Sequence, residues 1–168
     1  MTVAAAHSDP EAPPSVCERS LKSCIELVFA PPRPGMLAHP WNAAPGAVLR
    51  SALQTDALHV APGRWLLLDA DAQAVTDAVG AGAVAIDVDS KWRCFEIRGA
   101  GAGSALSAGV NVAMILEGRE CAAVPLFDCP TVIAVPRLGD GFDICVHASY
   151  TASLRVALQA ALRRSAGS

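Results

Sequence analysis

The order of apolar and polar residues along the chain predicts a series of short β-strands. In these runs apolar residues alternate with polar ones or fill consecutive positions, and most runs stop at glycine or proline, which interrupt an extended chain. They predict strands at residues 25–30, 84–89, 92–99, 121–127, 131–138 and 142–148, with turns at 128–130 and 139–141. Residues 57–70 predict a hairpin that turns at Pro62-Gly63, because this dipeptide supplies a fixed φ followed by a tolerated positive one.

Three further segments show the spacing of apolar residues that is typical of helices. Residues 71–82 predict a short helix that stops at glycines, and residues 104–108 begin another after a glycine turn. The last helix is expected over residues 149–164, with Ser149 as its N-cap. Its apolar stripe consists of Tyr150, Leu154, Ala157, Leu158, Ala161 and Leu162.

Strands joined in hairpins, a few helices and few long crossovers indicate an α+β domain with a mostly antiparallel sheet. Residues 1–15 are small, polar and proline-bearing, so we expect a disordered N-terminal tail. Residues 16–168 are expected to form a single domain, because a chain of 168 residues suits one hydrophobic core.

Composition narrows the possible functions. Hydrophobic residues make up 52% of the chain, but no run reaches the roughly 20 apolar residues of a membrane-spanning helix. The net charge of −3 gives no basic surface for nucleic acid. The first residues lack the basic and apolar regions of a secretory signal, so we expect a cytoplasmic protein. The apolar excess indicates a permanent protein partner, because large exposed apolar patches mark interfaces.

The cysteines and histidines predict no metal site. The six cysteines contain no C-x-x-C pair and have no histidine at zinc-finger spacing. Cys145 and His147 are two residues apart and share one face of a predicted strand, which is open to interpretation as a nucleophile and its base. We favour a structural role for this pair, because free cysteines are commonly buried.

The stretch FEIRGAGAGSALSAG, residues 95–109, has the order strand, glycine turn, helix that is found in dinucleotide-binding loops. Such a loop needs a third glycine where this chain has Ser104, and an acidic residue at the end of the next strand. The candidates Glu117 and Glu120 lie instead in a polar turn. We therefore favour a structural turn, and we predict no catalytic, cofactor-binding or metal-binding residue in this chain.

Four motifs occur in an order that resembles a known family. They are WLLL at residues 65–68, DVDSKW at residues 87–92, the glycine turn at residues 99–109 and SYT at residues 149–151. Over residues 25–164 their succession is similar to the gamma subunits of heterotetrameric sarcosine oxidase, relatives of the folate-binding aminomethyltransferases. The chain departs from the family pattern at Asp89-Ser90, at Ala102 and at His147, and these departures suggest a different partner surface.

The resemblance implies a fold like one half of an aminomethyltransferase. It also implies a non-catalytic structural subunit of a flavin-dependent oxidase or dehydrogenase complex that acts on sarcosine or another N-methylated amine. FAD, FMN, NAD, tetrahydrofolate and zinc would then belong to partner subunits, and the chief partner would be a large folate- and NAD-binding subunit.

A stand-alone tetrahydrofolate-binding or one-carbon transfer domain is the alternative, with Asp87 and Asp89 as candidates to hold the pterin. We favour the subunit, because 168 residues cover only part of the aminomethyltransferase-like architecture. Trp41 is our candidate for the partner interface, since tryptophan is enriched at interface hot spots, and it would equally suit a core position.

Overall fold

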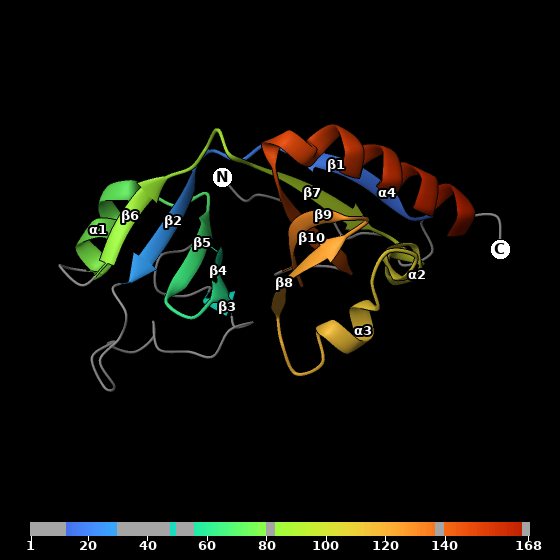
Figure 1. The fold of residues 1–168 in the computed structure, drawn as a ribbon, viewed down its shortest axis with the longest axis horizontal. Helices are drawn as coiled ribbons and strands as arrows, with labels where there is room; N and C mark the ends of the chain where they lie inside the picture. Colours follow the sequence, from blue (N-terminus) through green and yellow to red (C-terminus); the bar gives the residue numbers. More distant parts are fainter. Residues whose placement is uncertain (1–12, 30–47, 50–55, 80–82, 137–139, 166–168) are drawn as a thin grey trace, which may run out of the picture.

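Two five-stranded sheets lie against each other in the computed structural model, which describes residues 13–29, 48–49, 56–79, 83–136 and 140–165 (Figure 1). Sheet A has the strand order β1 (Ser15–Arg19), β7 (Trp92–Arg98), β10 (Gly141–His147), β9 (Cys129–Ala134), β8 (Cys121–Leu126). Sheet B has the order β3 (Val48–Leu49), β4 (Asp56–Ala61), β5 (Arg64–Leu68), β2 (Cys24–Phe29), β6 (Ala83–Asp87). All pairings between these strands are antiparallel, which confirms the expected α+β class.

Helices cover the outward faces of both sheets. α1 (Ala72–Val79) lies on sheet B, where its Val75 is buried among side chains of β2 and β5. α2 (Ala102–Ser107) and α4 (Thr151–Ser165) lie on sheet A, and α4 extends along β1 and β7 in Figure 1. The short α3 (Val112–Ile115) follows α2, and a 3₁₀ turn (Ala148–Tyr150) leads into α4. None of the helices in the described part of the chain is both long and apolar enough to cross a membrane.

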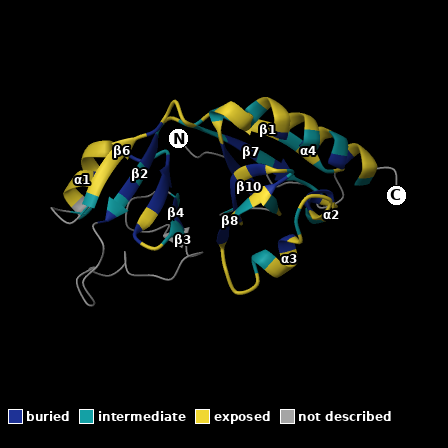
Figure 2. Ribbon diagram, in the orientation of Figure 1, coloured by how far each residue is buried: buried dark blue, intermediate teal, exposed yellow. Residues whose placement is uncertain are grey.

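The two sheets enclose a core to which both contribute. Its buried members are Cys24, Leu58, Leu66, Leu68, Val88, Cys94, Cys121, Val132, Ala134 and Cys145. β5 is buried on both faces, because Trp65 and Leu67 face α1 while Leu66 and Leu68 face sheet A. A strand covered on both faces requires apolar residues at consecutive positions, which explains the WLLL motif. Buried positions are concentrated in the strands, while the outward side of α4 is exposed (Figure 2).

Most predicted elements are confirmed to within a few residues. The hairpin predicted at residues 57–70 consists of β4 and β5, and the predicted helix at residues 71–82 is α1. The amide of Phe29 donates a hydrogen bond of 2.8 Å to the carbonyl of Gly63, which ties the hairpin turn to β2. The buried stripe of α4 contains Leu154, Leu158, Ala161 and Leu162, as expected.

Several local features differ from the sequence predictions, and β3 and α3 were not predicted. β1 is not predicted and begins at Ser15, the last residue of the expected tail, of which residues 1–12 lie outside the described residues. The turn between β8 and β9 is Phe127-Asp128, both with positive φ, so Pro130 lies in β9 opposite Pro125. Ser149 lies within the 3₁₀ turn rather than capping α4, and Tyr150 is exposed rather than part of the buried stripe.

We expect Gly141→Ala to lower the free energy of unfolding by about 3 kcal/mol. Gly141 starts β10 with φ of +125°, and a Cβ atom there would collide with the carbonyl oxygen of Ile97 in β7. Gly118→Ala is the matched control, because Gly118 also has a positive φ, +66°, but a Cβ atom would meet nothing. Urea denaturation measures both, and equal losses would show that the close approach to β7 has no cost.

Candidate functional site

The glycine turn after β7 has the geometry of a strand–turn–helix connection. Gly99 and Gly101 have φ of +96° and +85°, which L-residues rarely adopt, and α2 begins directly after them. α2 has only six residues, and three of them are buried in the core beneath α4. The neighbours of β7 are β1 and β10, both antiparallel, whereas a dinucleotide-binding loop stands between parallel strands.

The two candidate pterin ligands take part in the turn between β6 and β7. The carboxylate of Asp89 accepts a hydrogen bond from the amide of Cys24, the first residue of β2. The Oδ1 atom of Asp87 accepts a bond of 3.0 Å from the amide of Asp89. These bonds hold the turn against β2, which gives both carboxylates a structural role.

Cys145 and His147 share one face of β10, as predicted, but they do not contact each other as nucleophile and base. Cys145 is joined by a disulfide to Cys94, which lies directly opposite on β7 with a Cα–Cα distance of 4.2 Å. The ring of His147 packs on Trp92, with ring centroids 4.3 Å apart. Cys145 therefore has no free thiol in this structure. The sequence does not predict this disulfide.

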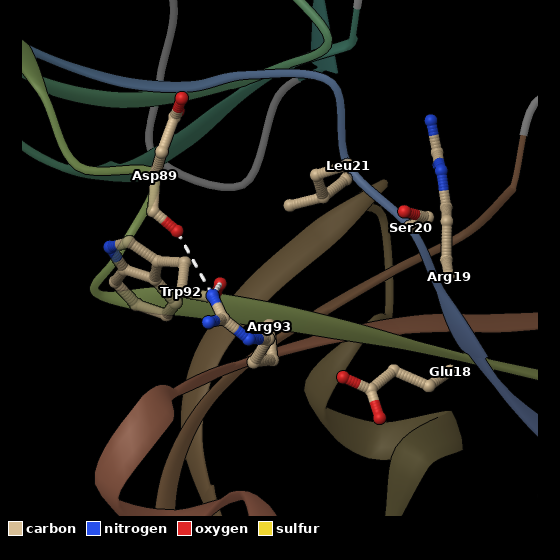
Figure 3. A pocket seen from close by; sticks show the side chains of 7 residues that line it. All are labelled: Glu18, Arg19, Ser20, Leu21, Asp89, Trp92 and Arg93. Carbon is tan, nitrogen blue, oxygen red and sulfur yellow. Dashed lines mark hydrogen bonds between the residues drawn. The ribbon is translucent and has the colours of Figure 1, made fainter.

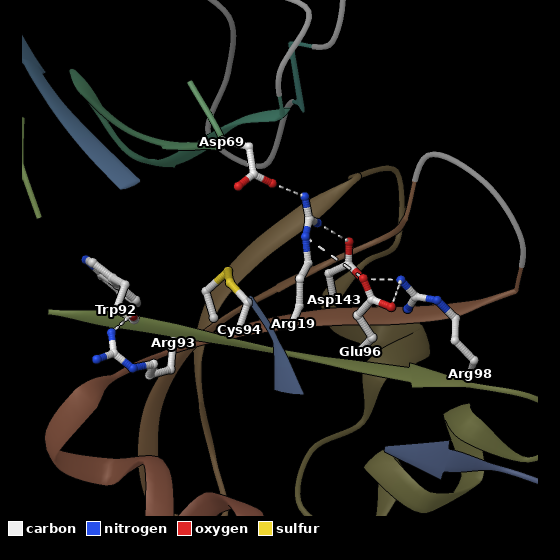
Figure 4. The surroundings of a disulfide bond; sticks show 9 residues. Arg19, Asp69, Trp92, Arg93, Cys94, Glu96, Arg98 and Asp143 are labelled. Atoms are coloured by element: carbon white, nitrogen blue, oxygen red, sulfur yellow. Dashed lines mark hydrogen bonds and ion pairs between the residues drawn. A yellow bond between two sulfur atoms is a disulfide. The ribbon is translucent and has the colours of Figure 1, made fainter. Parts of the chain in front are cut away.

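Three directly opposed residue pairs follow one another on the face of β7 and β10 that is turned toward sheet B. They are Trp92 with His147, Cys94 with Cys145, and Glu96 with Asp143. We call these six residues the inward ladder. Figure 4 shows Trp92 on one side of the disulfide, and Glu96 and Asp143 on the other. The opposite face of the same strands carries Phe95, Ile97, Ile144 and Val146, which are buried beneath α2 and α4.

Glu96 and Asp143 are like charges placed opposite each other, which would destabilise the pair without nearby cations. Arg19 of β1 supplies one cation, with its guanidinium nitrogens 3.6 Å from Asp143 and 3.9 Å from Glu96. Arg98 supplies the second, since it forms an ion pair with Asp143 and lies 3.7 Å from Glu96. The two arginines therefore offset the repulsion between the carboxylates of Glu96 and Asp143.

Arg19 also connects the two sheets. It forms an ion pair of 2.5 Å with Asp69, which follows β5 of sheet B and also accepts a bond from the amide of Lys22. Burial alone would lower the pKa of Arg19, but the hydrogen bond to Asp69 and the charges of Asp69, Asp143 and Glu96 raise it above the usual value. Arg19 therefore stays charged.

Two clefts flank the inward ladder at Trp92. The larger, about 430 Å³, is lined by Glu18, Arg19, Ser20, Leu21, Asp89, Trp92 and Arg93 (Figure 3). Its charged side chains are used within the chain, since Glu18 pairs with Arg155 and Arg93 donates to the carbonyls of Asp89 and Trp92 at 3.0 and 2.7 Å. The second cleft, about 260 Å³, lies between the sheets and includes Leu66, Trp92 and His147 in a mostly apolar wall. No set of three or more His, Cys, Asp or Glu side chains in the described ranges is placed to hold a metal ion.

Comparison with known proteins gives a structural match. A chain of the heterotetrameric sarcosine oxidase from Corynebacterium sp. U-96, solved in complex with pyrrole 2-carboxylate, superposes with a TM-score of 0.73. The match covers 94% of this chain and 87% of that chain, at 19% identity. The protein has the fold of a sarcosine oxidase subunit. No protein-family model and no curated protein sequence matches the chain.

The match agrees with the sequence resemblance at the level of the fold and of the complex named for the neighbour. In that fold the residues first considered for chemistry, Cys145, Asp87, Asp89 and the glycine turn, hold strands and turns in place. Trp41, the predicted interface residue, lies outside the described residues and stays a prediction.

We expect Arg19→Ala to lower the free energy of unfolding by about 2 kcal/mol, because it leaves the buried Asp143 and the half-buried Glu96 less compensated and removes the link to Asp69. Arg64→Ala is the control, because the Arg64 side chain is 55% exposed in its ion pair with Glu26 and should contribute less than about 1 kcal/mol. Urea denaturation of both variants measures the difference. Similar small losses would contradict a special role for Arg19.

Proposed function

We propose that this chain is the gamma-type, non-catalytic structural subunit of a multi-subunit, flavin-dependent oxidase or dehydrogenase of sarcosine or a related N-methylated amine. The observation that carries the proposal is the fold match, which spans 94% of this chain and 87% of the neighbour. A match over nearly the whole of both chains supports an equivalent subunit rather than a shared fragment. The ordered motifs at residues 65–68, 87–92, 99–109 and 149–151 support the gamma assignment.

The uses of the candidate residues support an assembly role. Cys145 is bonded to Cys94, and Asp87 and Asp89 hold the turn after β6. We propose accordingly that FAD, FMN, NAD, tetrahydrofolate and zinc are held by partner subunits, and that the complex is cytoplasmic. The chief partner in this proposal is the large folate- and NAD-binding subunit.

The outer strand of sheet B offers a surface for such a partner. Val84 and Ile86 lie on the same face of β6 and are 61% and 39% exposed. Figure 2 shows β6 as an exposed strand beside the buried β2. Exposed apolar side chains that lie together mark interfaces more often than isolated ones do. We therefore place the partner contact at Val84 and Ile86.

Co-expression tests the assignment. The tagged chain, produced together with the flavin-binding and folate-binding subunits of its own host, should purify with them as a coloured complex. The chain produced alone should carry no flavin or NAD. A stoichiometric flavin on the isolated chain, or an isolated monomer that ignores the other subunits, would overturn the proposal, and tetrahydrofolate binding by the isolated chain would favour the stand-alone domain.

We expect Val84→Lys to reduce recovery of the complex at least about tenfold, because a charge at an apolar contact must be buried without a partner. The melting temperature of the isolated variant should stay within about 2 °C of the parent chain, since Val84 is exposed. Val156→Lys is the matched control, because Val156 is 67% exposed on α4 and lies away from β6. Normal assembly of the Val84 variant would exclude this surface.

A further inference from the structure

The Cys94–Cys145 disulfide is placed where it can form and break without a change of fold. β7 and β10 pair over seven residue pairs, and both cysteines belong to that ladder at directly opposed positions. The outward face of the same strands is fixed by the core beneath α2 and α4, which includes Phe95 and Ile144. Two thiols at these positions would therefore remain neighbours after reduction.

Cys94 and Cys145 are the two described cysteines that are joined by a disulfide. Cys17, Cys24, Cys121 and Cys129 form no disulfide bond, although Cys24 and Cys121 lie in the same core between the sheets. Burial, followed by the nearby carboxylate of Asp89, raises the pKa of Cys24 to about 12, which makes its thiol a poor competitor in disulfide exchange. Exchange with Cys24 is thus disfavoured, and the bond should respond to external thiols.

Both sulfur-bearing residues are fully buried, so a reagent must reach them through the side chains that surround them. On one side the inward ladder continues with Glu96 and Asp143, which are held by Arg19 and Arg98. On the other side it continues with Trp92 and His147, whose rings line the cleft between the sheets. The aromatic pair borders the mostly apolar cleft between the sheets, whereas on the charged side Arg19, which lines the larger cleft, is held by its ion pairs with Asp69 and Asp143.

We propose that Cys94 and Cys145 form a reversible thiol–disulfide switch, gated by Trp92 and His147, that sets how firmly β7 is held to β10. Oxidation forms the Sγ–Sγ bond while the two thiols lose two protons and two electrons. A low-molecular-weight disulfide such as oxidised glutathione accepts the two protons and the two electrons, and its own S–S bond breaks to give two thiols. Reduction by a small thiol reverses each step. The fold is the same in both states and its stability differs.

A redox titration of the full chain tests the switch. The protein is equilibrated in glutathione buffers of increasing oxidised fraction; one portion is quenched with an alkylating agent in acidified denaturant and then alkylated fully while unfolded for mass spectrometry, and another is used for thermal unfolding. Cys94 and Cys145 should lose alkylation together. The oxidised form should melt roughly 10 °C higher, because the bond closes a loop between residues 51 apart in the sequence. Full alkylation in the most oxidising buffer, or equal melting temperatures, would overturn the proposal.

Variants separate the switch from general effects on stability. Cys145→Ala should abolish the dependence of the melting temperature on redox buffer, whereas Cys17→Ala, which removes an exposed free thiol, should retain it. Trp92→Ala should speed reduction of the bond by dithiothreitol at least about fivefold, Trp92→Phe should restore the slow rate, and Tyr150→Ala should leave it unchanged. Equal reduction rates for the two Trp92 variants and the parent would overturn the gate. If Cys145→Ala does not fold, the titration of the unmodified chain decides on the switch.

Discussion

The pairing of β7 with β10 in one register determines what the two sheets enclose. Because side chains alternate between the faces of a strand, a slip of β7 by one residue would turn Trp92, Cys94 and Glu96 toward α4 and bring Phe95 and Ile97 between the sheets. The observed register instead places apolar residues beneath two helices. It leaves an aromatic pair, a disulfide and a charged pair on the side of sheet B. The clefts, the link through Arg19 and the disulfide all follow from this arrangement.

The layered arrangement also accounts for much of the apolar composition. A chain with helices outside two stacked sheets has three apolar cores, one on each side of sheet B and one beneath α2 and α4. Strands such as β5 must then be apolar on both faces. The excess of apolar residues that suggested a protein partner is therefore largely buried within the chain. Among the described residues a smaller set of exposed apolar side chains, including Val84 and Ile86, is left to support that inference.

Local features of this fold could be predicted from the sequence, and long-range contacts could not. The Pro62-Gly63 turn, the glycines after β7 and the stripe of α4 are local patterns, and each produced the expected element. β1 has the sequence SVCER, in which polar residues predominate, because it is an edge strand whose charged side chains form ion pairs. Its place beside β7 depends on a partner more than 70 residues away in the chain.

The candidate site also depends on long-range contacts, which could not be predicted from the sequence. Cys145 and His147 were correctly placed on one face, but the residue opposite each of them depends on which strand pairs with β10. Cys94 is 51 residues from Cys145, and Asp69 is 50 residues from Arg19, so no spacing rule connects them. Only the strand order brings them together.

The proline pair at the β8–β9 hairpin affects how the protein meets other chains. Pro125 lies opposite Pro130, and two residues without amide hydrogens must occupy a position where neither donates to the other. At such a position the missing donor of Pro125 would have pointed away from β9, toward the side of β8 where no strand of the described ranges pairs with it. An incoming strand would find a gap in the row of donors there. This edge of sheet A is thus a poor template for strand addition, which protects the folded chain from growth into cross-β aggregates at that edge.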